Sequence, residues 1–416
     1  MNEIGKYAKD AARQLARSSG YQKNQVLLMV ADELISRCNE ILIANQLDVD
    51  AALANGLSPA LIDRLTLNPA RLRGISDDLR RVVALPNPIG EEFDHKTLAN
   101  GLKLHKQRVP LGVLGIIYES RPNVTIDAAA LAIKTSNAAI LRGGSETLNT
   151  NRALIKIVHR ALETNQMPVT AIQFIDDPDR ACVTRMLALR DYIDVIIPRG
   201  GAELHQFCRE NSAITVITGG IGICHLFVDK SADFEKAIEV IHNAKTQRPT
   251  VCNALDVALI HRAIAADFLP RLVTRLAVDG VVFRADSRAL SSIQALTPNI
   301  QLAGETDFDT EWLSLVLSLK VVNDLDEAID HIALHSSAHS DGILTRDINH
   351  ANRFIAEVDS AVVYVNASTR FTDGGEFGLG AEVAVSTQRL HARGPMGLRE
   401  LTTYKWVGVG DYHVRL

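Results

Sequence analysis

The sequence lacks the features that mark several protein classes. Its five cysteines form no CxxC pair and show no spacing to histidine that resembles a zinc site. No apolar run approaches the ~18 residues that a membrane-spanning helix needs. The first residues, MNEIGKYAKDAARQLARSS, have no apolar centre of the kind that a secretory signal requires. We therefore predict a cytoplasmic protein with reduced thiols, no metal site and no membrane span.

Dense blocks of positive charge are also absent. The formal net charge is −5 at pH 7, and lysine and arginine are spread along the chain. A nucleic acid or an anionic membrane would need a concentrated basic surface, so neither is expected as a partner. Any anionic ligand must be bound by local groups. The length of 416 residues suggests roughly two to three domains.

What the sequence contains is a regular alternation of strands and helices. Residues 1–95 show helical periodicity, for example at Val26, Val30 and Leu34. From residue 113 onward, short β-rich runs alternate with amphipathic helices. The expected strands are VLGIIYE, AAILR, AIQFID, DVIIP, ITVIT, DVALIH, VVFRAD, LVLSLKVV, SDGILT and SAVVYVN. This order predicts an α/β protein with parallel sheets covered on both faces.

Two segments fit neither set of strands and helices. Residues 96–112 contain an Asn-Gly hairpin signal, and the tail 397–416 is also rich in β-forming residues. We expect these segments to pair, either within the chain or across a subunit interface. They are the candidate oligomerisation element of a homo-oligomer.

Three turns after predicted strands are rich in glycine. They occur in LRGGSE (Gly143, Gly144), PRGGAE (Gly200, Gly201) and TGGIG (Gly219). Each one alone fits a plain tight turn, and none matches GxGxxG. Glycine also lets a backbone approach a phosphate at a helix start, so three such turns in one α/β half favour a nucleotide cofactor.

Two residues are candidates for catalysis. Cys252 follows Pro249, which ends a helix, so we expect its thiol in a loop at a domain junction, where a nucleophile could lie; a buried inert thiol is the alternative. The other four cysteines fall in predicted helices or a strand and are assigned to packing. Asn123 begins a helix directly after a strand, so it is either a helix cap or an oxyanion donor.

The combination of motifs resembles the aldehyde dehydrogenase superfamily. The motifs include YESRPNVT, AAILRGGSE, RPTVCNALDVALI, EWLSLVLSLKVV and LHARGPMGLRELTTYKW, and the resemblance covers nearly the whole chain. It implies two Rossmann-like α/β domains and a small β oligomerisation element. Residues 1–95 and 113–245 would form the cofactor-binding domain, residues 246–385 the catalytic domain, and 96–112 with 397–416 the oligomerisation element.

The resemblance also implies roles for single residues. Cys252 matches the family's nucleophile, and Asn123 matches its oxyanion-hole asparagine. Arg142 stands where many members contact the adenosine ribose, and Glu311 matches the glutamate that contacts the nicotinamide ribose. Because an arginine fork suits a 2′-phosphate, NADPH is favoured over NADH. From spacing alone, a surface ion pair is an equal alternative for Arg142 and for Glu311.

One position departs from the acid-forming members of the family. They carry a water-activating glutamate where this sequence has Thr218. Within the superfamily, the combination of YESRPNVT, RPTVCNA and LHARGPMGL most resembles the branch that reduces acyl phosphates, and Thr218 agrees with that resemblance. It implies NADPH-dependent reduction of L-glutamate 5-phosphate, supplied by glutamate 5-kinase, to L-glutamate 5-semialdehyde and phosphate, the second step of proline biosynthesis from glutamate.

Three arginines lie in motifs near the proposed site residues, namely Arg121, Arg248 and Arg393. Each could bind the substrate's phosphate or its α-carboxylate, and each could equally form a structural ion pair. Two other functions stay open at this point: an acid-forming aldehyde dehydrogenase, which Thr218 disfavours, and a catalytically idle relative, which the presence of both Cys252 and Asn123 disfavours.

Overall fold

The computed structural model describes residues 1–219 and 221–415, and they divide into two compact units. The first unit contains residues 1–219, 378–384 and 390–415, and the second contains 221–377 and 385–389. The sequence analysis placed the division at 245/246, about one strand and one helix later. That strand, β7 (Cys224–Val228), pairs with strands of the second unit's sheet, and α10 (Phe234–Thr246) packs on the same sheet.

Five helices begin the first unit: α1 (Asn2–Leu15), α2 (Gly20–Ser36), α3 (Cys38–Ala54), α4 (Pro59–Leu65) and α5 (Pro69–Ala84). Their starts follow from the sequence. Ser19 and Gln22 form a capping box at α2, and proline takes an early position in α4 and α5, where its missing N–H costs nothing. The apolar positions predicted from periodicity in α2 are buried.

A four-stranded parallel sheet forms the centre of the first unit, in the order β5-β4-β3-β6. Its strands are β3 (Val113–Tyr118), β4 (Ala138–Arg142), β5 (Ile172–Phe174) and β6 (Val195–Arg199). Helices α6 (Asn123–Lys134), α7 (Leu148–Thr164), α8 (Ala181–Leu187) and α9 (Ala202–Asn211) connect or follow them. The strand predicted at ITVIT is wrong: the structure has only an isolated parallel bridge there, between Val216 and Ile196.

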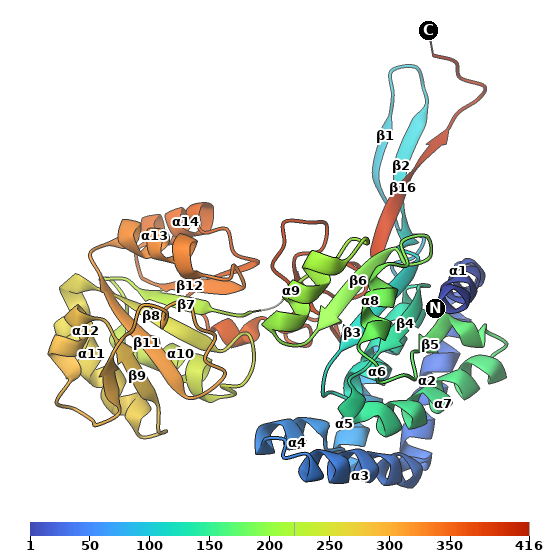
Figure 1. Ribbon diagram of the computed structural model, residues 1–416. Helices are drawn as coiled ribbons and strands as arrows, with labels where there is room; N and C mark the ends of the chain where they lie inside the picture. The colour runs from blue at the N-terminus through green and yellow to red at the C-terminus, as the bar shows by residue number, and fades with distance from the viewer. Residues whose placement is uncertain (220, 416) are drawn as a thin grey trace. The chain divides into compact units, whose positions relative to one another are not determined.

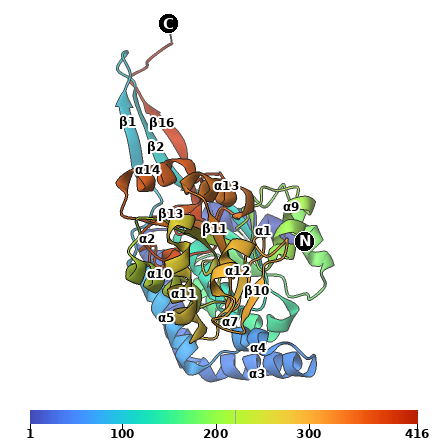
Figure 2. The same cartoon turned by 90° about the vertical axis from the view of Figure 1, so that its left-hand side faces the viewer.

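An arm of three antiparallel strands extends from the first unit (Figures 1 and 2). It consists of β1 (Glu92–Thr97), β2 (Lys103–Pro110) and β16 (Thr402–Val409). The predicted hairpin is present, with Gly101 at its turn in the left-handed region, φ +93°. β16 pairs with β2 over eight residues, so the two segments that fitted neither domain pair within the chain.

The second unit is built on a seven-stranded parallel sheet, in the order β10-β9-β11-β8-β7-β12-β13. Besides β7, its strands are β8 (Leu255–His261), β9 (Val282–Ala285), β10 (Ile300–Leu302), β11 (Val316–Val322), β12 (Ser340–Leu344) and β13 (Val362–Val365). The other strands in the described residues are β14 (Val385–Ser386) and β15 (Gly394–Pro395), which pair with each other.

Helices cover both faces of this sheet, as predicted (Figure 1). One apolar core lies between the sheet and α10, α11 (Arg262–Ala277) and α12 (Ser287–Ile293), and the other lies between the sheet and α13 (Leu325–His335) and α14 (Ile348–Glu357). Leu226 and Phe227, neighbours on β7, face opposite cores, as strand alternation requires. Short 3-10 helices occur at Ser145–Thr147, Val169–Ala171 and Thr369–Phe371. No helix in the described residues is long and apolar enough to cross a membrane.

Candidate active site

Cys252 lies in a loop of the second unit, residues 247–254, between α10 and β8. Its side chain is partly buried, so the thiol is neither fully exposed nor sealed in the core. The loop position agrees with the effect expected of Pro249. We expected this loop at a domain junction along the chain. The division of the chain instead lies before β7, about thirty residues before Cys252, so the loop lies within the second unit's segment.

A buried ion pair closes the base of this loop. Lys245, at the end of α10, donates to the carbonyl oxygen of Leu255 at 2.8 Å and lies 3.3 Å from Asp256 Oδ1. Burial lowers the pKa of Lys245 and raises the pKa of Asp256 to about 6. Asp256 also accepts a hydrogen bond from the backbone N–H of Trp312 at 3.3 Å. The two ends of the loop are therefore held together.

Gly222 explains one of the glycines in TGGIG. A Cβ at this position would lie 1.7 Å from the carbonyl oxygen of Cys252, so only glycine allows the two backbones to come this close. The N–H of Gly222 donates to Glu311 Oε1 at 2.9 Å. The structure thus brings Glu311, the predicted nicotinamide-ribose contact, to the backbone segment that packs on the Cys252 loop.

The residue after the thiol anchors the loop to a second segment. The side-chain amide of Asn253 donates to the carbonyl oxygens of Arg370, at 3.3 Å, and Thr372, at 2.9 Å. In return, Thr369 Oγ1 donates to the Asn253 carbonyl oxygen at 2.7 Å. These bonds restrict the backbone on both sides of Cys252, which is the preorganisation that a nucleophile requires.

Arg370 is a candidate that the sequence analysis missed. Its guanidinium donates to Gln247 Oε1 at 2.9 Å, which places it on the Cys252 loop. Burial lowers the pKa of Arg370, and the neighbouring charge of Arg248 lowers it further. Two arginines therefore share the surroundings of this loop, a setting that favours anions. No motif around residue 370 resembled a site, so only the folded chain reveals this arginine.

Cys224 has a packing role. It is buried on β7, donates to the carbonyl oxygen of Cys252 at 3.3 Å, and lies 3.8 Å from His339 Nδ1. Burial raises the pKa of Cys224 well above its ordinary value, so it stays a neutral thiol. Its side chain contacts the backbone of the Cys252 loop. The remaining cysteines, Cys38, Cys182 and Cys208, lie in helices, as predicted.

Asn123 is the first residue of α6, in the first unit, and it does not cap the helix. The N-cap is Pro122, and no side chain caps the N-terminus. Instead, Asn123 Nδ2 donates to Asp127 Oδ2, one turn later, at 3.0 Å. The cap interpretation is therefore wrong. The carboxylate orients the amide, and the second amide hydrogen is left for another acceptor.

The pKa of Asp127 is shifted by its surroundings. Desolvation raises its pKa to about 6, against a downward effect of the hydrogen bond from Asn123 and of the Arg199 charge. A carboxyl group at this position is therefore partly protonated in mildly acidic solution. Because the neutral form donates as well as accepts, protonation changes the group that orients Asn123.

Four of the predicted cofactor glycines, Gly143, Gly144, Gly200 and Gly201, follow the carboxyl ends of β4 and β6. These two strands are parallel, so their carboxyl ends lie at the same edge of the sheet (Figure 1). This edge is where open α/β sheets bind dinucleotides. Carboxylate side chains approach two of these glycines: a Cβ at Gly144 would lie 2.2 Å from Glu146 Oε1, and one at Gly200 would lie 2.3 Å from Glu119 Oε2. Gly201 has open space around its α-carbon.

Arg142 ends β4 with its side chain largely buried, at 8% exposure. Its guanidinium donates to the carbonyl oxygen of Pro178 at 3.0 Å, whereas its buried Nε has no partner. Among the described residues it forms no ion pair, so the surface salt bridge considered for it is not present. An arginine that is buried, charged and incompletely bonded fits a ligand phosphate.

The remaining predicted residues are spread over both units. Arg248 is exposed on the Cys252 loop, whereas Arg121 and Arg393 belong to the first unit. Gly143 packs closely on Asn151 and Tyr118, since a Cβ there would lie 2.3 Å from Asn151 Nδ2. Thr218 and Gly219 end the first unit.

The fold, with its two parallel sheets, three-stranded arm and loop-borne thiol, defines the class. The model of the aldehyde dehydrogenase family matches residues 1–281 and 306–407. The chain therefore belongs to the aldehyde dehydrogenase family. An acetylating aldehyde dehydrogenase from Geobacillus thermoglucosidasius has the same fold, with a TM-score of 0.71 at 16% identity, covering 100% of this chain and 97% of that one.

More similar proteins narrow the class. The gamma-glutamyl phosphate reductase of Escherichia coli O6:K15:H31 (strain 536 / UPEC) is 55% identical over 415 residues, with 100% of both chains covered. The crystal structure of the gamma-glutamyl phosphate reductase of Thermotoga maritima has a TM-score of 0.97 and 45% identity, covering 100% of this chain and 99% of that one. Within the family, the chain groups with the gamma-glutamyl phosphate reductases.

Proposed function

We propose that the chain reduces L-glutamate 5-phosphate to L-glutamate 5-semialdehyde and phosphate with NADPH, the second step of proline biosynthesis from glutamate. The full-length identity of 55% to a gamma-glutamyl phosphate reductase is the observation that carries this proposal. The local chemistry agrees with it: a thiol on a restrained loop can form an acyl-enzyme, and Thr218 cannot activate water to hydrolyse it.

Cys252 is the proposed nucleophile. Its thiolate attacks the γ-carbonyl carbon, the bond from that carbon to the phosphate oxygen breaks, and phosphate leaves behind a thioester. When bound, NADPH supplies the hydride that reduces this thioester. The resulting hemithioacetal then breaks its carbon–sulfur bond, which releases the aldehyde and restores the thiolate. The bonds of Asn253 and the close packing of Gly222 keep the loop in one position through these steps.

Asn123 is the proposed oxyanion donor, acting with the backbone N–H of Cys252. The carboxylate of Asp127 accepts one of its amide hydrogens, which sets the plane of the amide. The other hydrogen is then directed at the developing negative charge. A fixed dipole of this kind lowers the barrier because it needs no reorganisation when the charge forms.

The residues at the sheet edge fit a nicotinamide dinucleotide. Arg142 would hold the 2′-phosphate with its incompletely bonded guanidinium, and Gly143, Gly144, Gly200, Gly201 and Gly219 would line the path of the cofactor. Glu311 would accept hydrogen bonds from the nicotinamide ribose while one of its oxygens holds Gly222. The carboxylates of Glu119 and Glu146 border two of these glycines.

The substrate carries two anionic groups, a phosphate and an α-carboxylate. Arg248 is a proposed ligand for one of them. Arg370 is a second proposed ligand, because it bonds Gln247 on the Cys252 loop and lies close enough to Arg248 for their charges to interact. Arg121 and Arg393 remain proposed ligands from the first unit. Arginine suits both groups because its planar fork forms two parallel hydrogen bonds to a carboxylate or a phosphate.

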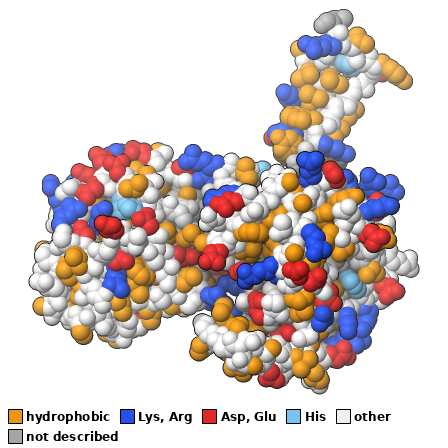
Figure 3. All heavy atoms as spheres, viewed as in Figure 1, with side chains coloured by type: hydrophobic (Ala, Val, Ile, Leu, Met, Phe, Trp, Pro, Cys, Tyr) orange, Lys and Arg blue, Asp and Glu red, His pale blue; other side chains and the backbone are white. Residues whose placement is uncertain are grey.

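The chain is further proposed to act in the cytoplasm as a homo-oligomer, on substrate supplied by glutamate 5-kinase. A cytoplasmic location keeps the catalytic thiol reduced. The arm gives the reason to expect an oligomer. Hydrophobic side chains are visible along it in Figure 3. On β16, Tyr404, Trp406 and Val409 are 46%, 54% and 54% exposed. Exposed apolar groups beside open strand edges are typical of subunit contacts.

A phosphate-dependence assay tests the proposed function. The reverse reaction is followed by nicotinamide absorbance, with NADP⁺ and glutamate semialdehyde, in the presence and absence of phosphate. We expect NADP⁺ reduction to require phosphate, because only phosphate can accept the acyl group from Cys252. Reduction at the same rate without phosphate would mean that water attacks the thioester, and the chain would then be an acid-forming dehydrogenase.

A further inference from the structure

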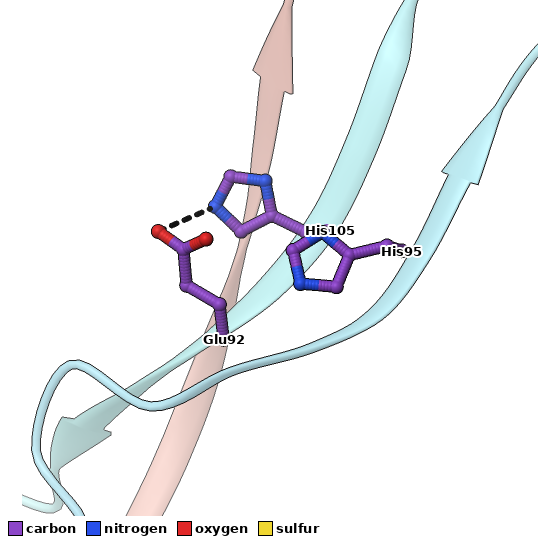
Figure 4. Close-up of side chains that lie close together, drawn as sticks. All are labelled: Glu92, His95 and His105. Atoms are coloured by element: carbon purple, nitrogen blue, oxygen red, sulfur yellow. Dashed lines mark ion pairs between the residues drawn. The ribbon is translucent and has the colours of Figure 1, made fainter.

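Three potential metal ligands meet on the arm, outside the proposed catalytic residues. They are Glu92 and His95 on β1 and His105 on β2, and one ligand atom from each lies within 4.8 Å of those of the other two. Figure 4 shows the two imidazole rings next to each other and the Glu92 carboxylate turned toward His105. The mechanism uses none of the three side chains.

A β-bulge creates this group. The pairing of β1 with β2 shifts between Phe93 and Lys96, so that two residues of β1, Asp94 and His95, stand opposite His105 alone. Asp94 takes a left-handed conformation, φ 55°, at this step. In a regular strand, Glu92 and His95 would point to opposite faces of the arm. The extra residue returns His95 to the face that carries Glu92 and His105.

Contacts on the other face of the arm confirm this assignment of faces. Phe93 is paired with Lys106, and its ring packs edge-on against Tyr404, with ring centroids 5.9 Å apart. Lys106 Nζ lies 4.5 Å from the centre of the Tyr404 ring and bonds Asp94 at 2.8 Å. Phe93, Tyr404 and Lys106 therefore lie on one face, and the two imidazoles with the Glu92 carboxylate lie on the other.

The three ligand side chains make few contacts apart from those with one another. His105 Nε2 lies 3.4 Å from Glu92 Oε1, and the His95 ring stacks on the His105 ring with centroids 5.2 Å apart. In the described part of the chain, neither imidazole ring forms another hydrogen bond or ion pair. His105 is the least mobile, because its side chain is only 13% exposed, whereas Glu92 and His95 are exposed and can rotate.

We propose that Glu92, His95 and His105 form a binding site for a late first-row divalent cation, with Zn²⁺ as the expected occupant. Two imidazoles and one carboxylate match the ligands of Zn²⁺, whereas Mg²⁺ and Ca²⁺ prefer oxygen alone. Metal–ligand bonds of about 2.0–2.1 Å put tetrahedral donor atoms about 3.4 Å apart. The separation of His105 from Glu92 already has this value, so rotation of the His95 ring would complete the set.

Neighbouring charges limit the affinity of this site. Lys103 and Lys405 lie on the same face of the arm, since Lys103 is two residues from His105 and Lys405 pairs with Gln107. Their positive charges oppose a cation, while Glu92 contributes the one negative charge among the ligands. Because both lysines are exposed, solvent and salt screen much of this repulsion. We expect micromolar affinity, with water or a side chain of another molecule in the fourth position.

Titration of the full-length protein with Co²⁺ and then with Zn²⁺ tests the proposal. Co²⁺ gives visible absorption bands that depend on its coordination, and a thiolate ligand adds a near-ultraviolet charge-transfer band. We expect one saturable Co²⁺ site per chain that lacks the thiolate band and is displaced by Zn²⁺. This signature separates the arm site from adventitious binding at Cys252.

Matched variants connect that signal to the three residues. His95→Gln and Glu92→Gln should weaken binding by at least about tenfold, whereas His413→Gln, a histidine change elsewhere on the arm, should leave it unaltered. His95 and Glu92 are exposed, and far-ultraviolet circular dichroism checks that each variant is folded. The proposal is overturned if the unaltered protein shows no saturable site without thiolate character, or if His95→Gln and Glu92→Gln bind as tightly as it does.

Discussion

At the scale of single residues, two side chains carry the proposed chemistry, and each is oriented by one neighbour. Asp127 orients the amide of Asn123, and the bonds of Asn253 restrain the backbone of Cys252. Neither neighbour is a proposed contact of the substrate. Their effect is to remove conformational freedom before the substrate binds, which lowers the entropic part of the barrier.

Replacement of Cys252 by serine should abolish NADPH-dependent turnover. A serine hydroxyl is a far weaker nucleophile than a thiolate, and the side chain keeps nearly the same size. Steady-state assays and single-turnover absorbance changes measure the loss. Cys38→Ser is the matched control, because Cys38 lies at the start of α3 and should tolerate the change at full activity. Comparable turnover in the Cys252 variant would refute its role.

Replacement of Asn123 by alanine should lower kcat by roughly 10²–10³, as expected for the loss of one oxyanion donor. Because the side chain caps no helix, the variant should keep most of its stability. Thermal unfolding measured beside kcat separates the two effects. A large drop in stability with an unaltered kcat would assign Asn123 a structural function instead.

Asp127 gives a prediction for pH. Its pKa is raised from 3.8 to about 6 in the folded chain, so the folded state binds more protons than the unfolded state between these values. Its contribution to stability is therefore present at low pH and is lost as pH rises from about 4 to about 6. Relative to the unaltered chain, Asp127→Asn should gain at most about 3 kcal/mol over this interval.

Denaturant unfolding at several pH values between 4 and 7 measures that gain. The lost hydrogen bond to Asn123 contributes an offset, so the informative quantity is the change in the stability difference with pH rather than its absolute value. A difference that stays constant across the interval would show that Asp127 has an ordinary pKa in the folded chain.

At the scale of elements, the position of the Cys252 loop depends on the residues just before β7. Gly222 precedes β7, and its α-carbon faces the Cys252 carbonyl oxygen at a distance that excludes any side chain. The buried Lys245–Asp256 pair closes the loop at its base. The loop is thus positioned by contacts with neighbouring segments as well as by its own residues.

Gly222→Ala should therefore displace the loop and reduce kcat by at least about tenfold, since the new methyl group and the Cys252 carbonyl cannot both keep their places. The rate of Cys252 alkylation by a thiol reagent gives an independent measure of the displacement. Gly74→Ala is the control: it lies in α5 with nothing near its α-carbon and should stabilise the helix by up to about 1 kcal/mol. Equal kcat and alkylation rates for Gly222→Ala and the unaltered protein would contradict the prediction.

At the scale of the whole molecule, assembly depends on the arm. Trp406 is 54% exposed on β16, and its ring lies 5.0 Å from the Lys106 ammonium group. Trp406→Glu should place a charge in the proposed subunit contact and shift the protein to smaller species in analytical ultracentrifugation. Tyr21→Glu is the control. Tyr21 is 72% exposed and lies on α2, which is not one of the three strands of the arm. An unaltered sedimentation profile for Trp406→Glu would exclude this face of the arm.

Several features could be predicted from sequence because they depend on local order along the chain. The strand–helix alternation, the Asn-Gly hairpin and the loop after Pro249 follow from periodicity and turn chemistry. The resemblance to the aldehyde dehydrogenases rested on motifs that run through the whole chain, and the comparisons confirm it. The roles given to Cys252 and Asn123 stay predictions until they are tested.

Other features came only from the tertiary structure, because they join residues that are distant in sequence. The division of the chain precedes β7, and Arg370 reaches the Cys252 loop through Gln247. The cation site on the arm is of the same kind. By itself the sequence determined the order of elements and the catalytic family, since these are written in local patterns. The pairing of strands and a single bulge decided which side chains meet, since contacts between distant residues form only when the chain packs.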